Sequence, residues 1–238
     1  MDTYQSIIAT LAMTMGLGWA SGINLYAAVC VLGLAGATGN LALPAELMVL
    51  QDPLVIAAAG LMYFVEFTAD KTPGVDSGWD TLHTFIRIPA GAMLAAGAVG
   101  DVTPALEVAA GLLGGTMAGA SHFTKASTRL LINTSPEPFS NWTASITEDL
   151  MVFAGLWTML HYPLLFLCLM LIFIGLVIWL LPKIVRAIRA VFRRLKAWLG
   201  GEKPEPPTGA PPTFDGAADG TAQTMPGMPD DPKRLEQL

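Results

Sequence analysis

The sequence predicts an all-α protein, a polytopic transmembrane bundle of about five to seven hydrophobic segments. Hydrophobic residues make up 53% of the 238 residues and charged residues only 13%, and the mean hydropathy is +0.53. A soluble domain carries about 25% charged residues, roughly twice as many. Several apolar runs also approach or reach the roughly 18 residues needed to cross a hydrocarbon core. They cover about 6–20, 24–39, 53–69, 88–100, 104–121 and 150–181.

Charge divides the chain into three predicted regions. Residues 1–182, the predicted transmembrane domain, hold four basic residues against twelve acidic ones. Residues 183–200 hold six basic residues and no acidic one, and residues 201–238 form a Pro-rich segment with few large apolar side chains. Such a composition buries too little surface to offset ordering entropy, so we expect 201–238 to be disordered. The net charge of −6 averages these unlike regions and therefore does not indicate a kind of partner. We expect no nucleic-acid partner.

Two hydrophobic stretches are predicted to be interrupted. The opening stretch, about 6–39, contains SGINLY at 21–26, and Ser, Gly and Asn are poor residues for a helix interior. We expect either a turn between two short helices or one broken helix there. The stretch 147–181 is long enough to cross twice, with a turn at the HYP motif of 161–163.

The segment 183–199 reads as a basic amphipathic helix. One stripe is apolar and the remaining positions carry Lys or Arg, a pattern suited to the anionic headgroups of membrane lipids. The alternative is that it continues the last span into solution. In either case the positive-inside rule places this end in the cytoplasm. The same rule groups the basic stretches 70–87 and 121–149 with it, because the connections 40–52 and 101–107 carry only acids.

A weak internal repeat is consistent with this grouping. TPGVDSGWDTLHT at 72–84 aligns with SPEPFSNWTASIT at 135–147 with four identities, Trp79 and Trp142 among them. The repeat would relate 53–100 to 116–163. Internal repeats with a site at their interface are common in transporters, although chance similarity between two short polar stretches is an equal alternative.

The ionisable residues of the hydrophobic region fall on helix faces. Asp76, Asp80, His83 and Arg87 follow one face of a helix at i, i+4, i+7 and i+11, and a second face starts at His122 with similar spacing. Ionisable residues inside a membrane segment mark function by default, although any one of them can be interfacial or paired structurally. We therefore predict a substrate- or ion-binding site. Its candidate residues are Asn24, Glu66, Asp70, Lys71, Asp76, Asp80, His83, Arg87, His122, Lys125, Arg129, Ser135, Glu137 and Asn141.

The candidate site matches no catalytic or metal-binding spacing. The GxSxG, HExxH and P-loop motifs are absent from the sequence, and the two His residues of the site stand apart. We expect no catalytic residue, metal or other cofactor. Basic side chains can hold a phosphate or carboxylate, and the carboxylates can carry protons or cations. A small polar or anionic substrate is the expected ligand, and a homo-oligomer is left open.

The motifs SGINLY, EFTADKTPGVDSGWD, IRIPAGA, SHFTKASTR and SPEPFSN resemble a family of bacterial multi-pass membrane proteins, the domain-of-unknown-function family DUF4126. The resemblance covers about 15–160 and implies a location in the bacterial inner membrane, but it implies no activity. Its polar positions correspond here to most of the candidate site residues, together with Pro73, Pro136 and Pro138.

Three functions are compatible with these patterns. The first is transport of a small polar or charged substrate, by a carrier, channel or lipid-headgroup translocator. The second is an intramembrane enzyme that acts on a phosphate-bearing lipid, with Asp76, Asp80 or His83 as base. The third is a non-catalytic membrane scaffold that acts through the basic helix and the tail.

Overall fold

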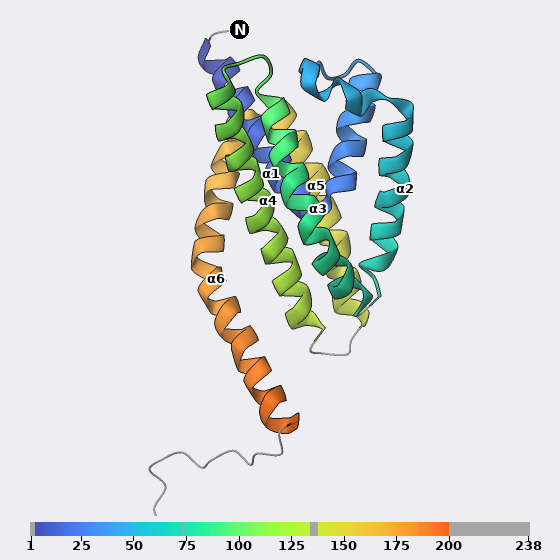
Figure 1. The fold of residues 1–238 in the computed structure, drawn as a ribbon, viewed down its shortest axis with the longest axis vertical. Helices are drawn as coiled ribbons and strands as arrows, with labels where there is room; N and C mark the ends of the chain where they lie inside the picture. The colour runs from blue at the N-terminus through green and yellow to red at the C-terminus, as the bar shows by residue number, and fades with distance from the viewer. Residues whose placement is uncertain (1–2, 73, 134–137, 200–238) are drawn as a thin grey trace, which may run out of the picture. The chain divides into compact units, whose positions relative to one another are not determined.

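The computed structural model describes residues 3–72, 74–133 and 138–199. Ser135, Glu137 and the Pro-rich tail lie outside the described residues. Contacts group Met1–Arg194 into one unit and Leu195–Leu238 into another, of which only the helical residues 195–199 are described. The described residues are helical, which confirms the all-α class (Figure 1). The elements are α1 (Thr3–Ala37), η1 (Ala45–Gln51, a 3₁₀ helix), α2 (Pro53–Ala69), α3 (Val75–Ala98), α4 (Pro104–Ile132), α5 (Pro138–His161) and α6 (Pro163–Leu199).

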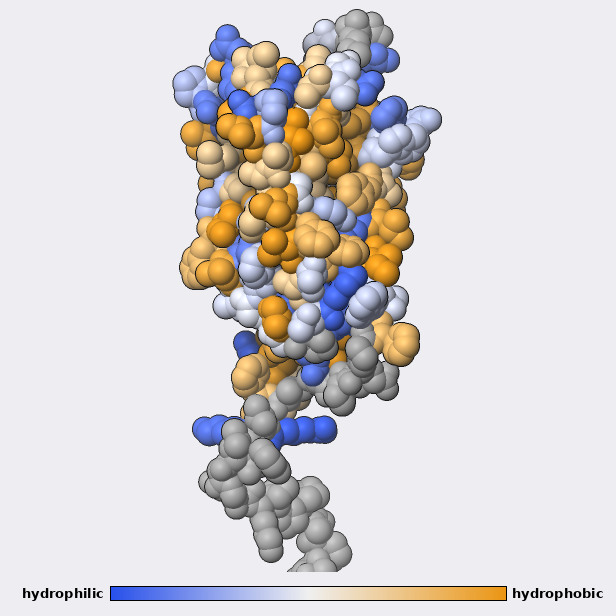
Figure 2. All heavy atoms as spheres, turned by 90° about the vertical axis from the view of Figure 1, so that its right-hand side faces the viewer, coloured by the Kyte–Doolittle hydropathy of each residue, from blue (hydrophilic) through white to orange (hydrophobic). Residues whose placement is uncertain are grey.

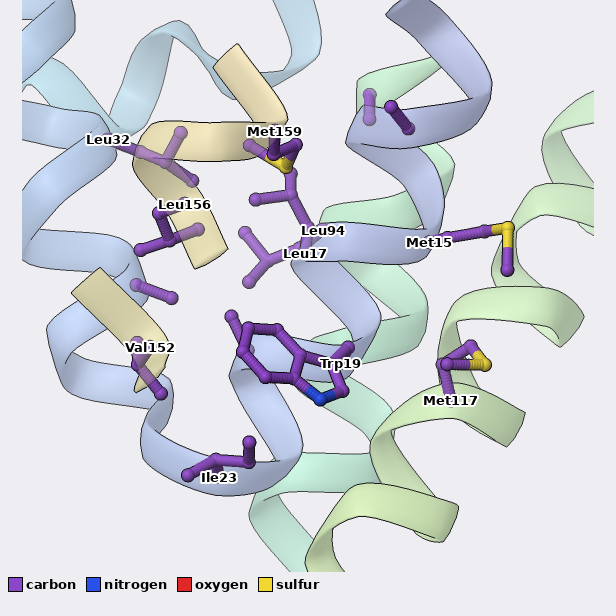
Figure 3. Close-up of a cluster of buried hydrophobic side chains, with 14 of the residues drawn as sticks. Met15, Leu17, Trp19, Ile23, Leu32, Leu94, Met117, Val152, Leu156 and Met159 are labelled. Carbon is purple, nitrogen blue, oxygen red and sulfur yellow. The ribbon is translucent and has the colours of Figure 1, made fainter. Parts of the chain in front are cut away.

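Helix α1 is broken in the middle of the SGINLY motif. Asn24 has non-helical dihedral angles (φ −148°, ψ 92°) and caps the helix that follows it, because its Oδ1 accepts the backbone N–H of Ala27 at 2.9 Å. Figure 3 shows the bend, with Trp19 on the first limb, Ile23 at the vertex and Leu32 on the second limb. The expectation of an interrupted first segment is therefore confirmed, in its broken-helix form.

Both limbs of α1 end at the same end of the bundle. The second limb reaches η1, where a Cβ on Gly33 would clash with the carbonyl of Leu50. The first limb borders Val102 and Leu106, which follow the end of α3, and η1 touches that end through Leu47. The helix thus enters the bundle to its vertex and returns (Figure 1).

Three of the four helix boundaries repeat at the 63-residue interval of the sequence repeat, whereas α4 starts at Pro104, 51 residues after the start of α2 at Pro53. Helix α4 ends at Ile132, 63 residues after the end of α2 at Ala69. Helix α5 begins and ends 63 residues after α3, at Pro138 against Val75 and at His161 against Ala98. The polar stretches that the sequence presented as loops are therefore mostly helix, and the first connection is reduced to residues 70–74.

The basic part of α6 lies at the same end as the 70–74 connection. Helix α6 continues through Pro182 to Leu199 without a break, so the basic segment is the continuation of the last hydrophobic helix. Val185 and Ile188 of this part line a cavity with Ser77 at the start of α3 and Leu130 near the end of α4. Helices α5 and α6 are separated by the non-helical residue Tyr162, which lies in the predicted HYP turn.

Small residues allow α1, α3 and α4 to approach closely. A Cβ on Gly18 would lie 2.7 Å from the Cα of Gly114, which no real contact allows, so the two backbones touch there. The glycines at 111, 115 and 119 face Ile88, Ala92 and Ala96 of α3, and a Cβ on Gly115 would lie only 3.3 Å from the Cβ of Ala92. Small residues at four-residue spacing form a helix face that allows such close approach. Larger side chains, Trp19 and Leu156 among them, fill the remaining core (Figure 3).

The polarity of the bundle is inverted relative to a soluble protein. Glu66, Arg87 and Arg129 are fully buried, whereas Leu54 is 80% exposed and Phe85 79% exposed. Apolar side chains cover much of the face shown in Figure 2, below a hydrophilic upper rim. Such a large exposed apolar surface is typical of a surface that contacts a membrane or another protein.

Two described helices are long and apolar enough to cross a membrane, Thr3–Ala37 and Pro163–Arg194. The pair η1 and α2, bent by 68°, counts as a third if it is one span. Helices α3 and α4 carry several charged side chains, which lower their mean hydropathy although all of them except Glu107 are buried.

Candidate functional site

The ammonium group of Lys125, on α4, is the centre of a buried ionic cluster. Its Nζ lies 2.8 Å from Asp70 Oδ2 and 3.3 Å from Glu66 Oε1, both on α2. It also donates to the backbone carbonyl of Ile23, at the vertex of α1, at 3.2 Å. Asp80 and Glu148 complete the shell, with oxygens at 3.8 and 3.7 Å. Residues from α1 to α5 therefore converge on one side chain that is almost completely buried.

Arg87, on α3, joins the same cluster from the other side. Its guanidinium forms ion pairs with Glu66 and, at 3.3 Å, with Asp80, and it donates to the Gly22 carbonyl at 3.3 Å. All three charged side chains are at most 1% exposed. An isolated charge at such a position would be very unfavourable, so the pairs are required for these residues to be buried at all.

Arg129, one turn further along α4, pairs with Glu148 of α5 in a bidentate geometry. Nη2 lies 2.7 Å from Oε2 and Nε lies 3.2 Å from Oε1. Nη1 donates to the carbonyls of Asp70 at 2.9 Å and Asn141 at 3.1 Å. The planar guanidinium thus fastens the end of α2 to α5.

The break in α1 presents two helix ends to this cluster. The carbonyls of Gly22 and Ile23, at the end of the first limb, accept hydrogen bonds from Arg87 and Lys125. The carboxamide of Asn24, which caps the second limb, donates to Asp149 Oδ1 on α5 at 3.0 Å. Cations at a helix C-terminus and a carboxylate near an N-terminus both match the helix dipole.

A second polar group, separate from the Lys125 shell, joins the ends of α3, α4 and α5. Asn133 donates to both oxygens of Asp76 at 2.8 and 2.9 Å, and Asn141 donates to Asn133 Oδ1 at 2.7 Å. Asp76 also accepts the backbone N–H of Gly74 at 2.9 Å and that of Ser77. This group links the two connections that follow α2 and α4 and acts as a structural clasp.

Both nitrogens of each buried histidine ring have a hydrogen-bond partner. His83 Nδ1 donates to the Trp79 carbonyl at 2.9 Å, and Nε2 lies 3.1 Å from the Tyr26 hydroxyl. His122 Nδ1 faces the Arg87 guanidinium, a pure donor, at 3.2 Å and must accept, and Nε2 lies 2.8 Å from the Thr84 hydroxyl. These bonds fix the orientation of both rings within the bundle.

Lys71 lies at the edge of the site, in the connection after α2. Its Nζ lies 2.7 Å from the centroid of the Phe67 ring and donates to the Phe67 carbonyl at 3.0 Å. Burial lowers the pKa of this ammonium below its ordinary value, and the nearby carboxylates of Asp149 and Asp70 partly offset that shift.

A cavity of about 260 Å³ adjoins the cluster between α4, α5 and α6. Lys125 and Glu148 reach its wall from the cluster, and several other lining side chains are partly exposed, so it communicates with the outside of the bundle. Its remaining lining residues are Ile23, Ser121, Thr124, Thr128, Ala144, Thr147, Met151 and Phe173. No group of three or more Asp, Glu, His or Cys in the described part of the chain is arranged to hold a metal ion.

Comparison with known proteins identifies the family. The model of the family described as a domain of unknown function, DUF4126, matches residues 11–183. The chain belongs to this family. No curated protein and no solved structure matches it. The matched range contains the whole ionic cluster and the break in α1, and it excludes most of the basic segment of α6.

The structure brings most of the predicted site residues of this DUF4126 chain together. Glu66, Asp70, Asp80, Arg87 and Lys125 form the centre of the cluster. Asn24, His122 and Arg129 contact it or its partners, while Asp76 and Asn141 belong to the clasp, His83 pairs with Tyr26, and Lys71 lies at the edge. Ser135 and Glu137 lie outside the described residues.

Two important participants were not among the predicted site residues. Glu148 and Asp149 directly precede the predicted hydrophobic run 150–181, whereas α5 spans Pro138–His161 and places both residues inside the helix. Their spacing offers a signal, because Asn141, Ser145 and Glu148 follow one helix face at i, i+4 and i+7. Ser121, one turn before Lys125, was also missed, and its hydroxyl donates to the Trp19 carbonyl at 2.9 Å.

Proposed function

We propose that this DUF4126 protein is an integral membrane transporter for a small polar or charged substrate. The observation that carries the proposal is the broken helix α1, whose Gly22 and Ile23 carbonyls meet a buried ionic cluster. Many secondary transporters build their sites from discontinuous helices whose ends coordinate the substrate or coupling ion. The repeated helix pairs α2–α3 and α4–α5 provide the matching architecture, with the site between them.

The cluster suits a protein that changes conformation. Lys125 contacts carboxylates on α2, α3 and α5, so any movement of α4 exchanges partners within one set of ion pairs. Bistable packing of this kind converts a small change at a binding site into a larger motion. The adjoining cavity gives a substrate access to Lys125 and Glu148.

Two alternatives from the sequence receive less support. Asp76, Asp80 and His83, the candidate bases for lipid hydrolysis, are not among the residues that line the cavity beside the cluster. A scaffold that acts through its basic helix and tail would not need a buried ionic cluster beside a cavity. Transport is therefore the function that the arrangement favours.

For the membrane orientation, we propose that α2 to α6 each cross the bilayer and that α1 enters and returns. Lys71 and the α6 cations Lys183, Arg186 and Arg189 lie at one end of the bundle, and Glu46 and Asp101 lie at the other. By the positive-inside rule the basic end is cytoplasmic. In a bacterial cell this corresponds to the inner membrane, with the C-terminal tail in the cytoplasm and anionic lipid headgroups at the basic segment of α6.

Flux measurements in proteoliposomes test the transport proposal. Purified protein is reconstituted into liposomes, and radiolabelled amines, carboxylates, amino acids and inorganic ions are added outside in turn. We expect saturable uptake of one class, reduced at least tenfold in Lys125→Met and unchanged in Glu107→Gln, an acidic residue at the far end of α4. Absence of flux for every class, together with release of product from phosphate-labelled lipids, would replace transport by the enzymatic alternative.

A further inference from the structure

The hydrogen-bond capacity of the cavity wall defines the ligand that it can accept. Two charged side chains of opposite sign, Lys125 and Glu148, reach the wall. The presence of a Lys alone would favour an anion. The hydrogen bonds already made by each wall residue decide between the two signs.

Most donors of the cavity wall are already used. A Lys ammonium has three N–H groups, and those of Lys125 are directed to Asp70 Oδ2, Glu66 Oε1 and the Ile23 carbonyl. The hydroxyl of Thr124 donates to the Ala120 carbonyl at 2.8 Å. The hydroxyls of Thr147 and Ser121 also donate to backbone carbonyls. An anion in the cavity would therefore find the ammonium N–H groups engaged, and Thr128 is the one lining residue whose hydroxyl makes no hydrogen bond within the described residues.

The acceptors of the same wall retain capacity. Each oxygen of Glu148 accepts one hydrogen bond from Arg129, although a carboxylate oxygen can accept two. The hydroxyls of Thr124, Thr147 and Ser121 keep lone pairs as acceptors, because each of them acts as a donor. The wall therefore offers acceptors to a ligand that brings its own donors.

The net charge of the cluster also favours a cationic ligand. Arg129 and Glu148 neutralise one another, which leaves the carboxylates of Glu66, Asp70 and Asp80 around the cations Arg87 and Lys125. One oxygen of each of these three carboxylates is buried without a hydrogen-bond partner in the described part of the chain. The cluster thus has an excess of negative charge.

We propose that the cavity between α4, α5 and α6 binds a small organic ammonium ion, with its charged nitrogen at Glu148. Ile23, Met151 and Phe173 line the apolar part of the cavity, which suits a short hydrocarbon substituent. The aromatic ring of Phe173 belongs to a class that attracts ammonium groups. This inference names a substrate class for the transport proposed above, and it rests on that proposal only for the claim that the bound cation is carried.

Calorimetric titration of the purified full-length protein in detergent tests the inference. The probes are n-butylammonium, n-butanol and butyrate, which share a short alkyl chain and differ in charge. We expect saturable binding of n-butylammonium and at least tenfold weaker binding of the other two. Glu148→Gln should weaken n-butylammonium binding at least tenfold, while Glu107→Gln should leave it unchanged.

A second variant covers the case in which Glu148→Gln destabilises the protein by leaving Arg129 unpaired. Ala144→Leu fills the cavity and keeps every ion pair of the cluster, and it should abolish binding. Butyrate binding as tight as that of n-butylammonium, or no saturable binding of the ammonium, would overturn the inference. Saturable n-butylammonium binding without flux would leave this site standing and count against transport, whereas flux of an anion without ammonium binding would do the reverse.

Discussion

The Ile23 carbonyl and the Lys125 ammonium are joined by a 3.2 Å hydrogen bond, although 102 residues separate them in the chain. The carbonyl is available because the helix breaks at the next residue, Asn24, and so cannot supply the usual backbone donor. The ammonium can be buried because this carbonyl and two carboxylates accept hydrogen bonds from its three N–H groups. The break and the buried charge therefore depend on each other.

Removing the cap at the break should destabilise the protein. Asn24→Ala loses the hydrogen bond to the Ala27 N–H, a loss of about 1 kcal/mol, and leaves Asp149 Oδ1 without its partner, a further loss of about 1–3 kcal/mol. Thermal or chemical unfolding followed by circular dichroism measures the change. Asn40→Ala, at an exposed amide, is the matched control and should change stability by less than about 0.5 kcal/mol. Equal effects of the two variants would contradict the role assigned to Asn24.

The vertex of α1 should tolerate no side chain at Gly22. A Cβ there would clash with Ser121 Oγ and the Ala118 carbonyl of α4, and the backbone oxygen cannot move without displacing the helix. Gly22→Ala should therefore lower the melting temperature, with a loss of about 1–3 kcal/mol. Gly78→Ala, in α3 with open space around its position, should instead stabilise the helix by up to about 1 kcal/mol. A Gly22 variant as stable as the wild-type protein would show that the helices are not in contact there.

Arg87 and Glu66 should show strong energetic coupling. Arg87→Gln leaves the buried carboxylates of Glu66 and Asp80 without this partner and should cost about 3–5 kcal/mol. Adding Glu66→Gln removes one of these charges, so the double variant should recover part of the loss. A double-mutant cycle on unfolding free energies gives the coupling. Simple additivity of the two changes would disprove a direct pair.

Cysteine labelling should distinguish the two ends of the bundle. In a background without the free cysteines Cys30 and Cys168, the variants Val75→Cys and Val102→Cys place thiols at exposed positions of opposite ends. A membrane-impermeant maleimide added to intact cells should modify position 102 alone, and permeabilised cells should allow both. Modification of position 75 alone in intact cells would invert the proposed orientation.

The pKa of Lys71 should be lowered by burial and raised by the nearby carboxylate of Asp149. Burial lowers its pKa below the ordinary 10.5, so its neutral amine should form at a lower pH than in a free lysine. Asp149 raises the pKa, hence Asp149→Asn should lower it further. Reductive ¹³C-methylation followed by an NMR pH titration reports both values, with Lys71→Arg assigning the signal. A wild-type midpoint at or above 10.5 would contradict the burial.

Helical spacing predicted the site better than hydropathy predicted the helix boundaries. Asp80 and Arg87 were placed on one face from their positions alone, and the structure buries both on the inner side of α3. The start of α5 was misplaced because the polar stretch around Asn141 resembles a loop when the neighbouring helices are unknown. The polar side chains of α5 bond to Asn24 of α1 and Arg129 of α4, and these partners depend on the tertiary arrangement.

The backbone groups of the site lay beyond sequence reasoning. The SGINLY motif indicated an interruption, but the carbonyls of Gly22 and Ile23 are not encoded by any side-chain pattern. Their partners Arg87 and Lys125 lie on other helices, and only the packing of α1 against α3 and α4 brings them together. The pairing of Asn24 with Asp149 depends on the same packing.

The reversal of α1 also restricts the order in which the protein can be assembled. During synthesis α1 emerges first, yet the groups that satisfy its vertex belong to α3, α4 and α5. Exposed backbone polar groups are very unfavourable in lipid, so the returning limb cannot settle in the hydrocarbon region by itself. In the membrane orientation proposed above, we therefore expect the returning limb of α1 to reach its final position only after the later helices have been made. The polar groups at the vertex of α1 thus find their partners only in helices that follow it in the chain.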